Sequence, residues 1–236
     1  MKLEISNLNK SYGEKEVLKD INFTFEEGKI YGLLGRNGAG KTTFFNAIND
    51  DISIDSGTFF LETEFGKNKL NVQDIGYVIS TPIVPEFLTG REFLQFYLDI
   101  NEEKITEKKT IEEYFDLVKL SIKDQNTLLK DYSHGMKNKM QILVNIIANP
   151  KVILLDEPLT SLDIVVQEDM KRLLKEFSKN HIIIMSTHIL ELAVDLCDEI
   201  IVLSNKKIEK VEKKNLNSKK YKDKIIQQLK EEKEYE

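Results

Sequence analysis

The chain has little cysteine and no long apolar run. Its single cysteine, Cys197, excludes an internal disulfide and fits a reducing compartment, and we expect Cys197 to be a small buried apolar side chain. No apolar segment follows Met1, and no run approaches the roughly 18 apolar residues that a membrane-spanning helix needs. We therefore expect a cytoplasmic protein that is neither secreted nor membrane-spanning.

The chain also lacks an excess of basic charge. Its 34 Lys and Arg residues against 40 Asp and Glu give a net charge of −6. This balance argues against a broad electrostatic footprint for nucleic acid, so we expect no nucleic-acid partner. The length of 236 residues suits one large domain or two closely joined subdomains with a well-buried core.

A glycine-rich segment is the strongest motif in the sequence. Residues 35–42 match the phosphate-loop pattern G-x-x-x-x-G-K-[ST] at every fixed position. Glycines let the backbone curl closely around an anion, and the loop N–H groups then point at the phosphates. The candidate triphosphate-binding residues are Gly35, Arg36, Asn37, Gly38, Ala39, Gly40, Lys41, Thr42 and Thr43.

The residues around this loop supply the context that the motif requires. Residues 30–34 form an apolar run typical of a buried strand, and residues 43–48 continue with helical spacing. We expect Lys41 to reach the β- and γ-phosphates as a point charge, while Thr42 binds Mg²⁺ through its hydroxyl. Thr43 offers one more donor.

The order of apolar patterns predicts an α/β fold. Residues 3–8 and 17–25 alternate like half-exposed strands, so an antiparallel β layer comes first. Between residues 152 and 203 strands and helices alternate, which implies a mostly parallel sheet with helices on both faces. Helical spacing between residues 90 and 148 predicts an inserted helical subdomain. Residues 213–236 are nearly all charged and are expected to form a peripheral helix or a frayed tail.

Two carboxylates follow the apolar run at residues 152–155. Asp156 ends this strand, which is the usual position of a Mg²⁺ ligand in a nucleotide site. Glu157 is a candidate to orient and deprotonate the attacking water. Taken alone, an Asp-Glu pair at a strand end is more often a solvated boundary. A phosphate loop on the same sheet favours the catalytic interpretation.

Three further residues each have a functional and a local interpretation. His188 follows the predicted strand at residues 181–186, and it is either a donor to the γ-phosphate or a helix-cap histidine. Asp163 opens the next helix and is in the simpler case only its N-cap. Tyr12, beside a turn glycine, either stacks on a purine ring or is an ordinary turn aromatic.

The loop at residues 80–89 contains two prolines, which prevent regular strand pairing. It nevertheless carries apolar side chains, which either form a contact surface or tuck under the loop's own domain. These side chains are Ile83, Val84, Phe87 and Leu88. Further along the chain, Ser133 is the natural N-cap of a helix that ends at Asn149 and Pro150.

Together these motifs resemble the nucleotide-binding subunit of an ABC transporter, over residues 3–208. Residues 35–42 match the family's Walker A loop, and residues 152–156 match its Walker B strand. The remaining matches are Tyr12 with the adenine-stacking loop, Glu157 with the catalytic glutamate, residues 161–163 with the D-loop, and His188 with the switch histidine. The segment Tyr132, Ser133, His134, Gly135 and Met136 matches the family signature in its serine and second glycine.

The resemblance implies a phosphate-loop NTPase fold with a RecA-like sheet. It implies one ABC ATPase domain at residues 1–212, with a catalytic core at about 1–85 and 150–212 and a helical subdomain at about 86–149. Two such subunits, identical or paired, would face each other head to tail and enclose ATP and Mg²⁺ between the Walker A loop of one and the signature of the other. A separate transmembrane permease is the implied partner, which places the subunit on the inner face of the cell membrane.

Two positions depart from the family's pattern. Ser80 stands where the family usually has a glutamine that touches Mg²⁺ and the attacking water, and its shorter side chain would reach the metal only through a water. His134 and Met136 stand where glycine and glutamine are commonest, so that either an imidazole meets the γ-phosphate or His134 faces solvent. Residues 79–82 and 132–137 are similar to exporter subunits that handle peptide antibiotics such as bacitracin and lantibiotics.

Two other functions fit part of this pattern. A non-transport ABC ATPase, such as a cluster-assembly factor, would carry the same motifs without a membrane partner. A small-molecule kinase would use the same phosphate loop, but it would give no reason for the signature, Glu157 and His188.

Overall fold

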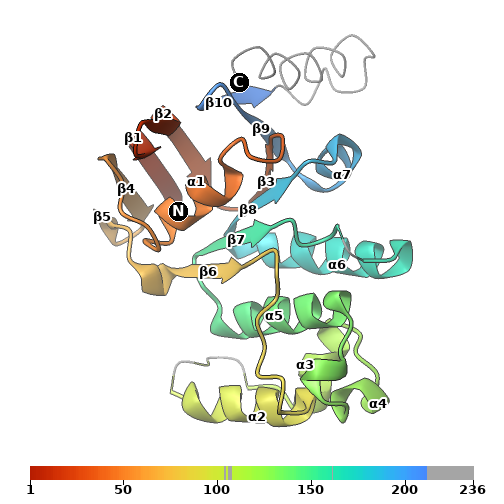
Figure 1. The fold of residues 1–236 in the computed structure, drawn as a ribbon. Coiled ribbons are helices and arrows are strands. Elements are labelled where there is room, and N and C mark those ends of the chain that lie inside the picture. The colour runs from red at the N-terminus through yellow and green to blue at the C-terminus, as the bar shows by residue number, and fades with distance from the viewer. Residues whose placement is uncertain (104, 106–107, 161, 212–236) are drawn as a thin grey trace.

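The computed structural model describes residues 1–103, 105, 108–160 and 162–211. Its strands form two sheets, and its helices lie between and around them (Figure 1). The predicted charged tail at residues 213–236 and Ser161 of the predicted D-loop lie outside the described residues.

The N-terminal strands form an antiparallel sheet in the order β2-β1-β4-β5. In its centre Leu3 lies opposite Phe25 and Leu61, and all of these side chains are buried. Alternate residues thus face the core, as expected for a sheet that is covered on one side. The predicted antiparallel layer is confirmed. Its strands are β1 (Lys2–Tyr12), β2 (Lys15–Glu26), β4 (Ser56–Thr63) and β5 (Gly66–Lys69).

The second sheet has the order β10-β9-β3-β8-β7-β6. Neighbouring strands from β9 to β6 are parallel, and β10 adds an antiparallel edge that was not predicted. The central strands are continuous buried apolar runs, typical of a sheet covered on both faces. Its strands are β3 (Lys29–Leu34), β6 (Ile75–Val78), β7 (Val152–Asp156), β8 (Ile182–Thr187), β9 (Glu199–Ser204) and β10 (Lys207–Val211).

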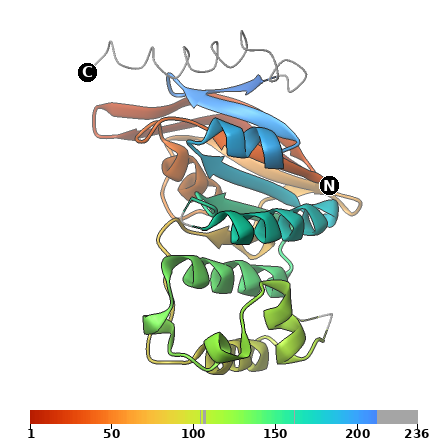
Figure 2. The same cartoon turned by 90° about the vertical axis from the view of Figure 1, so that its right-hand side faces the viewer.

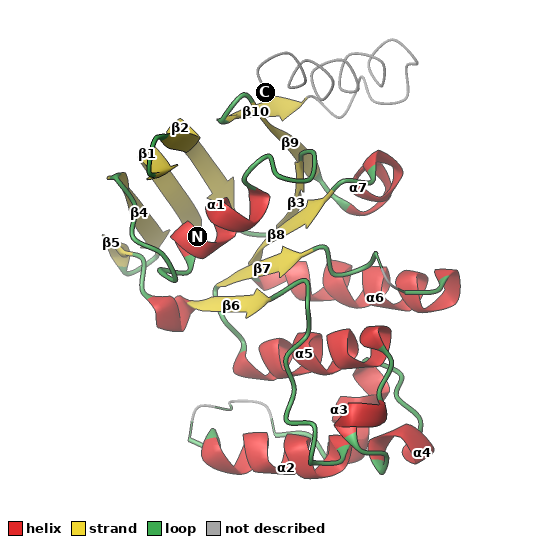
Figure 3. Ribbon diagram, in the orientation of Figure 1, coloured by secondary structure: helices red, strands yellow, loops and turns green. Residues whose placement is uncertain are grey.

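Helices cover both faces of this mostly parallel sheet, which confirms the predicted fold class (Figures 1, 2 and 3). Helix α1 lies between the two sheets, and α6 and α7 lie on the opposite face. The chain between β6 and β7 forms α2 to α5, which lie together beside β6. The helices are α1 (Lys41–Ile48), α2 (Gly90–Ile100), α3 (Ile111–Leu117), α4 (Ile122–Gln125), α5 (His134–Ala148), α6 (Ile164–Phe177) and α7 (Leu190–Leu196).

Capping residues divide the predicted helical stretch into short helices. Thr89, Thr110 and Ser121 each form a capping box at the start of α2, α3 and α4. Ser133 caps α5 as predicted, and Asn149 ends that helix in the left-handed conformation. The borders of the helical subdomain, near residues 86 and 149, remain predictions.

Two apolar clusters lie on the two faces of the parallel sheet. Strand β7 contributes Ile153 and Leu155 to the cluster shared with α2, α3 and α5 to α7, and Val152 and Leu154 to the cluster shared with α1 and the antiparallel sheet. The second cluster holds α1 firmly beneath the phosphate loop. Cys197 is fully buried, as predicted. Within the described residues, no helix combines the length and apolar character needed to cross a bilayer.

Candidate active site

The phosphate loop connects the buried end of β3 to the first turn of α1, as predicted. Gly38 and Gly40 have φ angles of 87° and 103°, a left-handed region in which a side chain is strained. No side chain caps the N-terminus of α1. Its first N–H groups are therefore available to an anion at the positive end of the helix.

Lys41 folds back over the loop that precedes it. Its Nζ donates to the carbonyl oxygens of Gly35 at 2.8 Å and Arg36 at 3.1 Å. The same ammonium lies 3.7 Å from Oε1 of Glu157, and the side chain is only 7% exposed. Lys41 thus lies between the loop and the carboxyl end of β7, where it was predicted to meet phosphates.

Asp156 connects the phosphate loop to the middle of the sheet. One carboxylate oxygen, Oδ2, accepts from the Thr42 hydroxyl at 2.9 Å, and the other, Oδ1, accepts from the Ser186 hydroxyl. Asp156 is 3% exposed. Burial raises the pKa of the nearby Tyr77 phenol, whose hydroxyl donates to Asn46, and the negative charge of Asp156 raises that pKa further.

Glu157 has an unusual backbone conformation. Its φ of 52° lies in the left-handed region, which costs a residue with a side chain about 1–2 kcal/mol. Three contacts hold it there: its N–H donates to Ser186, its carbonyl accepts from the Thr160 hydroxyl, and its carboxylate accepts from His188. His188 Nδ1 lies 2.7 Å from Oε2 and 2.9 Å from Oε1. The two predicted catalytic residues therefore lie in direct contact.

Tyr12 lies at the other end of the site. It is the last residue of β1 and is 51% exposed, so one face of the ring is open to a stacking partner. The ammonium of Lys10 lies 4.7 Å from the centre of the ring, while the Lys10 residue is 8% exposed. This arrangement favours the predicted base-stacking role over that of a simple turn aromatic.

A cavity of about 580 Å³ joins these residues into one site. It brings together predicted residues from five separate parts of the chain. It also includes Lys15, Val17 and Thr160, which the sequence analysis missed. Lys15 is the strand partner of Tyr12, so the hairpin pattern was the available signal for it. The cavity is lined by Tyr12, Lys15, Val17, Asn37, Gly38, Gly40, Lys41, Thr42, Thr43, Ser80, Asp156, Glu157, Thr160 and His188.

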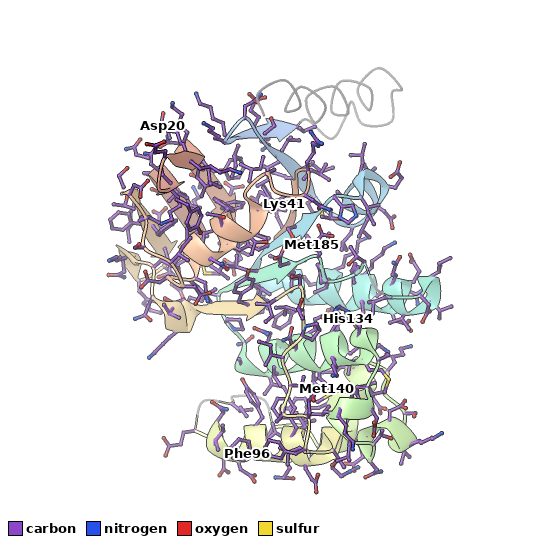
Figure 4. All side chains as sticks on the ribbon, in the orientation of Figure 1. Asp20, Lys41, Phe96, His134, Met140 and Met185 are labelled. Atoms are coloured by element: carbon purple, nitrogen blue, oxygen red, sulfur yellow. The ribbon has the colours of Figure 1, made fainter. Side chains whose placement is uncertain are left out.

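The predicted signature residues are not part of this cavity. Ser133, His134, Gly135 and Met136 lie at the start of α5, and none of them lines it. Figure 4 shows His134 well apart from Lys41. Ser133 and His134 are exposed, and within the described part of the chain the Ser133 hydroxyl accepts only from Met136 N–H of its own helix, at 3.2 Å. One copy of the chain therefore presents the signature away from its own phosphate loop.

Of the remaining predicted residues, only Ser80 lines the cavity. Ser80 is exposed. Gly35, Arg36 and Ala39 belong to the loop but do not line the cavity. Asp163 caps α6 by accepting from Val165 and Val166 N–H, so its local interpretation is observed.

The loop that carries Ser80 has some apolar side chains that are exposed and others that are at least partly buried. Ile83 and Phe87 are 77% and 80% exposed, whereas Val84 packs against the core and Leu88 is partly buried. Both sequence interpretations thus apply, to different side chains. The loop is bound to the segment before the signature, because Leu129 N–H donates to Leu88 and Lys130 N–H donates to Glu86.

The donor set also fits a divalent cation. The Thr42 hydroxyl and the Asp156 carboxylate are adjacent oxygen donors, the type that Mg²⁺ prefers. No group of three or more His, Cys, Asp or Glu side chains able to hold a metal occurs in the part of the chain that the structure describes. A site built from one hydroxyl and one carboxylate, completed by phosphate oxygens, is the pattern of nucleotide enzymes.

An uncapped helix behind a glycine-rich loop, with Asp156 and Glu157 at the end of the neighbouring strand, defines the class of phosphate-loop nucleoside triphosphatases. Comparison with known proteins makes the assignment narrower. The ABC transporter family model matches residues 18–160. The chain belongs to this family and is one of its ATP-binding subunits, an ABC ATPase.

Several curated relatives align with most of the chain. The bacitracin transport ATP-binding protein BcrA of Enterococcus faecalis is 35% identical over 208 residues, covering 85% of this chain and 66% of BcrA. The lantibiotic transport ATP-binding protein SrtF of Streptococcus pyogenes is 32% identical, covering 84% of this chain and 85% of SrtF. The phosphonates import ATP-binding protein PhnC of Fusobacterium nucleatum is also 32% identical, covering 87% of this chain and 90% of PhnC.

Solved structures show the same fold. An ATP-binding subunit of an ABC transporter superposes with a TM-score of 0.79 at 23% identity, covering 98% of this chain and all of that one. A dimeric ATP-binding cassette, bound to ADP and phosphate in a post-hydrolysis state, gives a TM-score of 0.74 at 24% identity, covering 89% of this chain and 99% of that one. ATP-binding subunits of this family dimerise and pair with a transmembrane permease.

Proposed function

We propose that this subunit binds ATP with Mg²⁺, closes into a head-to-tail dimer around two ATP molecules, and drives a permease that exports peptides or drugs. The observation that carries the proposal is the division of the site. The phosphate loop, Asp156, Glu157 and His188 line one cavity, whereas Ser133 and its neighbours are presented elsewhere.

ATP binding is assigned to the loop and its flanks. The N–H groups at residues 38–43 and the Lys41 ammonium hold the phosphates, with the base stacked on Tyr12. The oxygens of Thr42 and Asp156 would hold Mg²⁺, with Ser80 a weaker candidate acting through water. When bound, the metal neutralises charge on the β- and γ-phosphates.

Hydrolysis is assigned to Glu157 and His188. The water oxygen attacks the γ-phosphorus while the bond from γ-phosphorus to the β–γ bridging oxygen breaks, which yields ADP and phosphate. Glu157 accepts the proton of the water. His188 holds the Glu157 carboxylate at 2.7 Å and can turn its N–H toward the γ-phosphate once the nucleotide separates them.

Dimer closure follows from the position of the signature. Ser133 and Gly135 lie at the positive end of α5, a helix of 15 residues, so this end attracts a γ-phosphate held by a second copy. Cleavage of that phosphate removes the shared ligand and lets the two copies part.

The permease is proposed to dock on the loop at residues 81–91. Its exposed Ile83 and Phe87 are the anchors, and the hydrogen bonds from residues 129–130 connect the loop to the segment that ends at Ser133. A movement of the permease would thus be transmitted to the signature through these main-chain hydrogen bonds. The direction of transport and the cargo are inferred only from the similarity to the bacitracin and lantibiotic transport proteins. The similarity to a phosphonate import protein argues against this inference.

One set of variants tests this function. Glu157→Gln should retain ATP and accumulate a dimer, because the base is lost and the binding groups remain.

Ile83→Ser with Phe87→Ser should uncouple transport while leaving ATPase activity intact, and loss of ATP binding in that variant would refute the docking assignment. Purification through a tag on this chain should yield a membrane permease. Recovery of a soluble scaffold instead would favour the cluster-assembly function.

A further inference from the structure

Ser186 is a buried hydroxyl that the mechanism above does not use. It is the fifth residue of β8, follows an apolar run, and is 0% exposed. The parallel pairing of β7 with β8 places it directly opposite Asp156. Its position is therefore set by the register of the central sheet, where backbone pairing leaves little freedom.

The Ser186 hydroxyl joins two functional residues through one oxygen atom. It donates to Oδ1 of Asp156, and the same oxygen accepts the N–H of Glu157 at 3.1 Å. A hydroxyl has a single proton to donate, so these two bonds fix its orientation. The first bond holds Oδ1 of Asp156 in place, and the second supports the left-handed backbone of Glu157.

The remaining oxygen of Asp156 is bonded to the phosphate loop. The Thr42 hydroxyl donates to Oδ2 at 2.9 Å, so an unbroken chain of hydrogen bonds runs from Thr42 through Asp156 and Ser186 to Glu157. A displacement of Asp156 is thereby passed to the backbone of Glu157. The middle of this chain, at Ser186 and Asp156, is buried, so a hydrogen bond lost there is costly to replace.

We propose that Ser186 is a positioning residue for ATP hydrolysis, which sets the backbone of Glu157 according to the position of Asp156. The proposal rests on the roles assigned above to Asp156 and Glu157. Ser186 touches neither ATP nor the reacting water. It acts by keeping the predicted base and the predicted metal ligand in a fixed relation when the phosphate loop is loaded.

The test is Ser186→Ala in the full chain, measured beside Ser186→Thr and Ser178→Ala. Alanine removes the hydroxyl, so that Oδ1 of Asp156 and the N–H of Glu157 lose the bonds that Ser186 makes to them, and kcat should fall about ten- to hundredfold. The KM for ATP should change by less than about threefold, because the loop and Lys41 remain. Ser186→Thr keeps the hydroxyl and should restore most of the kcat. Ser178 is another buried serine, bonded to the Lys175 carbonyl far from the cavity, and its alanine variant should keep a normal kcat.

A second readout does not depend on turnover. In equilibrium titrations with a fluorescent ATP analogue, Mg²⁺ should increase the affinity of the parental protein and of Ser178→Ala, but increase that of Ser186→Ala by a smaller factor. Should Ser186→Ala fail to fold, Ser186→Cys replaces it, since a thiol is nearly isosteric but a weak donor, and its kcat should also fall.

Two results would overturn the proposal. One is a folded Ser186→Ala, or Ser186→Cys, with kcat within about twofold of the parental value. The other is an equal loss of kcat in Ser186→Ala and Ser178→Ala, which would mean that general destabilisation is the cause. Glu157→Gln separates the proposal from the function on which it rests. If Glu157→Gln hydrolyses ATP at the parental rate, Glu157 is not the base and the assignment of the base fails. If Glu157→Gln is inactive but Ser186→Ala keeps the parental kcat, only the role proposed for Ser186 fails.

Discussion

The phosphate-loop half and the signature half of the proposed ATP site are built in different ways. In the first, Lys41 and Thr42 begin α1, and Asp156 and Glu157 lie at the end of β7. Hydrogen bonds and an ion pair connect these residues to one another, to the loop and to Ser186. In the second, Ser133 is an exposed residue at the start of α5, and among the described residues its hydroxyl accepts only from the first turn of that helix. One half is complete within a single chain, and the other is available to a second copy.

The difference has a physical origin in the sheet and the helix. Strand ends in a parallel sheet are fixed by neighbours on both sides, so β7 and β8 deliver Asp156 and Ser186 in register. The N-terminus of α5 is held mainly by the packing of its apolar side, which leaves its first turn accessible. We therefore expect damage to the first half to abolish binding, and damage to the second to abolish only closure.

The largest effect is expected from Lys41→Ala. Loss of the ammonium removes charge-assisted bonds to the phosphates, so ATP affinity should fall about a hundredfold or more. Titration with a fluorescent ATP analogue measures this loss. Lys69→Ala, on the exposed strand β5, is the control and should bind normally. A Lys41→Ala protein with the parental affinity for ATP would show that the phosphate-loop half does not bind ATP as proposed.

Ser133→Arg should separate binding from closure. A single chain does not place Ser133 near its own cavity, so ATP affinity of the monomer should stay within about twofold of the parental value. The bulky cation should nevertheless prevent dimerisation and lower ATPase activity strongly, as light scattering and phosphate release would show. Ser121→Arg changes the equivalent cap of α4 and should dimerise normally. An equal loss of dimerisation and ATPase activity in both variants would instead indicate that the substitution damages the helix.

A smaller effect is expected at Tyr12, where the first half meets the base. Removal of the ring in Tyr12→Ala should weaken ATP binding about three- to tenfold through lost stacking. Tyr12→Phe keeps the ring and should bind almost as well as the parent. The measurement compares the affinity for ATP with the affinity for inorganic triphosphate, because a stacking role predicts that Tyr12→Ala weakens the binding of ATP alone.

The smallest effect concerns the far end of the signature helix. His181 stacks on Phe177 and contacts the side chain of Asn149, which ends α5. Burial lowers the pKa of His181 below its usual value, while the Phe177 carbonyl and Glu27 oppose this shift. The unfolded chain therefore binds the proton more readily, and stability is full above about pH 6.5 and declines as the pH falls below it.

This pH dependence is measurable by thermal unfolding. Between pH 7.5 and 5.5 the contribution of His181 should fall by less than about 1 kcal/mol, and His181→Gln should lack this part of the decline. The control is His134→Gln, because that residue is exposed and lies at the opposite end of α5. An identical pH profile for the parent and His181→Gln would show that the imidazole does not titrate between these values.

The sequence predicted the first half of the site well because its motifs are local. Residues 35–42 are contiguous, and Asp156 and Glu157 end an obvious strand, so both the loop and the parallel sheet were accessible from pattern alone. The edge strand β10 and the short helix α4 were missed, since short elements give weak periodicity, whereas the charged residues 102–109 do separate α2 from α3 as the apolar spacing indicated. The role proposed for Ser186 depends on register between strands 30 residues apart, which no local pattern encodes.

A mixing experiment tests the central claim most directly. Lys41→Ala and Ser133→Arg, each combined with Glu157→Gln, are studied alone and together by light scattering with saturating ATP and Mg²⁺. The account predicts that each alone remains near 27.4 kDa and that the mixture forms a species of twice this mass, since one composite site is restored between the two chains. A mixture that stays monomeric, or a single variant that dimerises alone, would contradict a site shared between two copies.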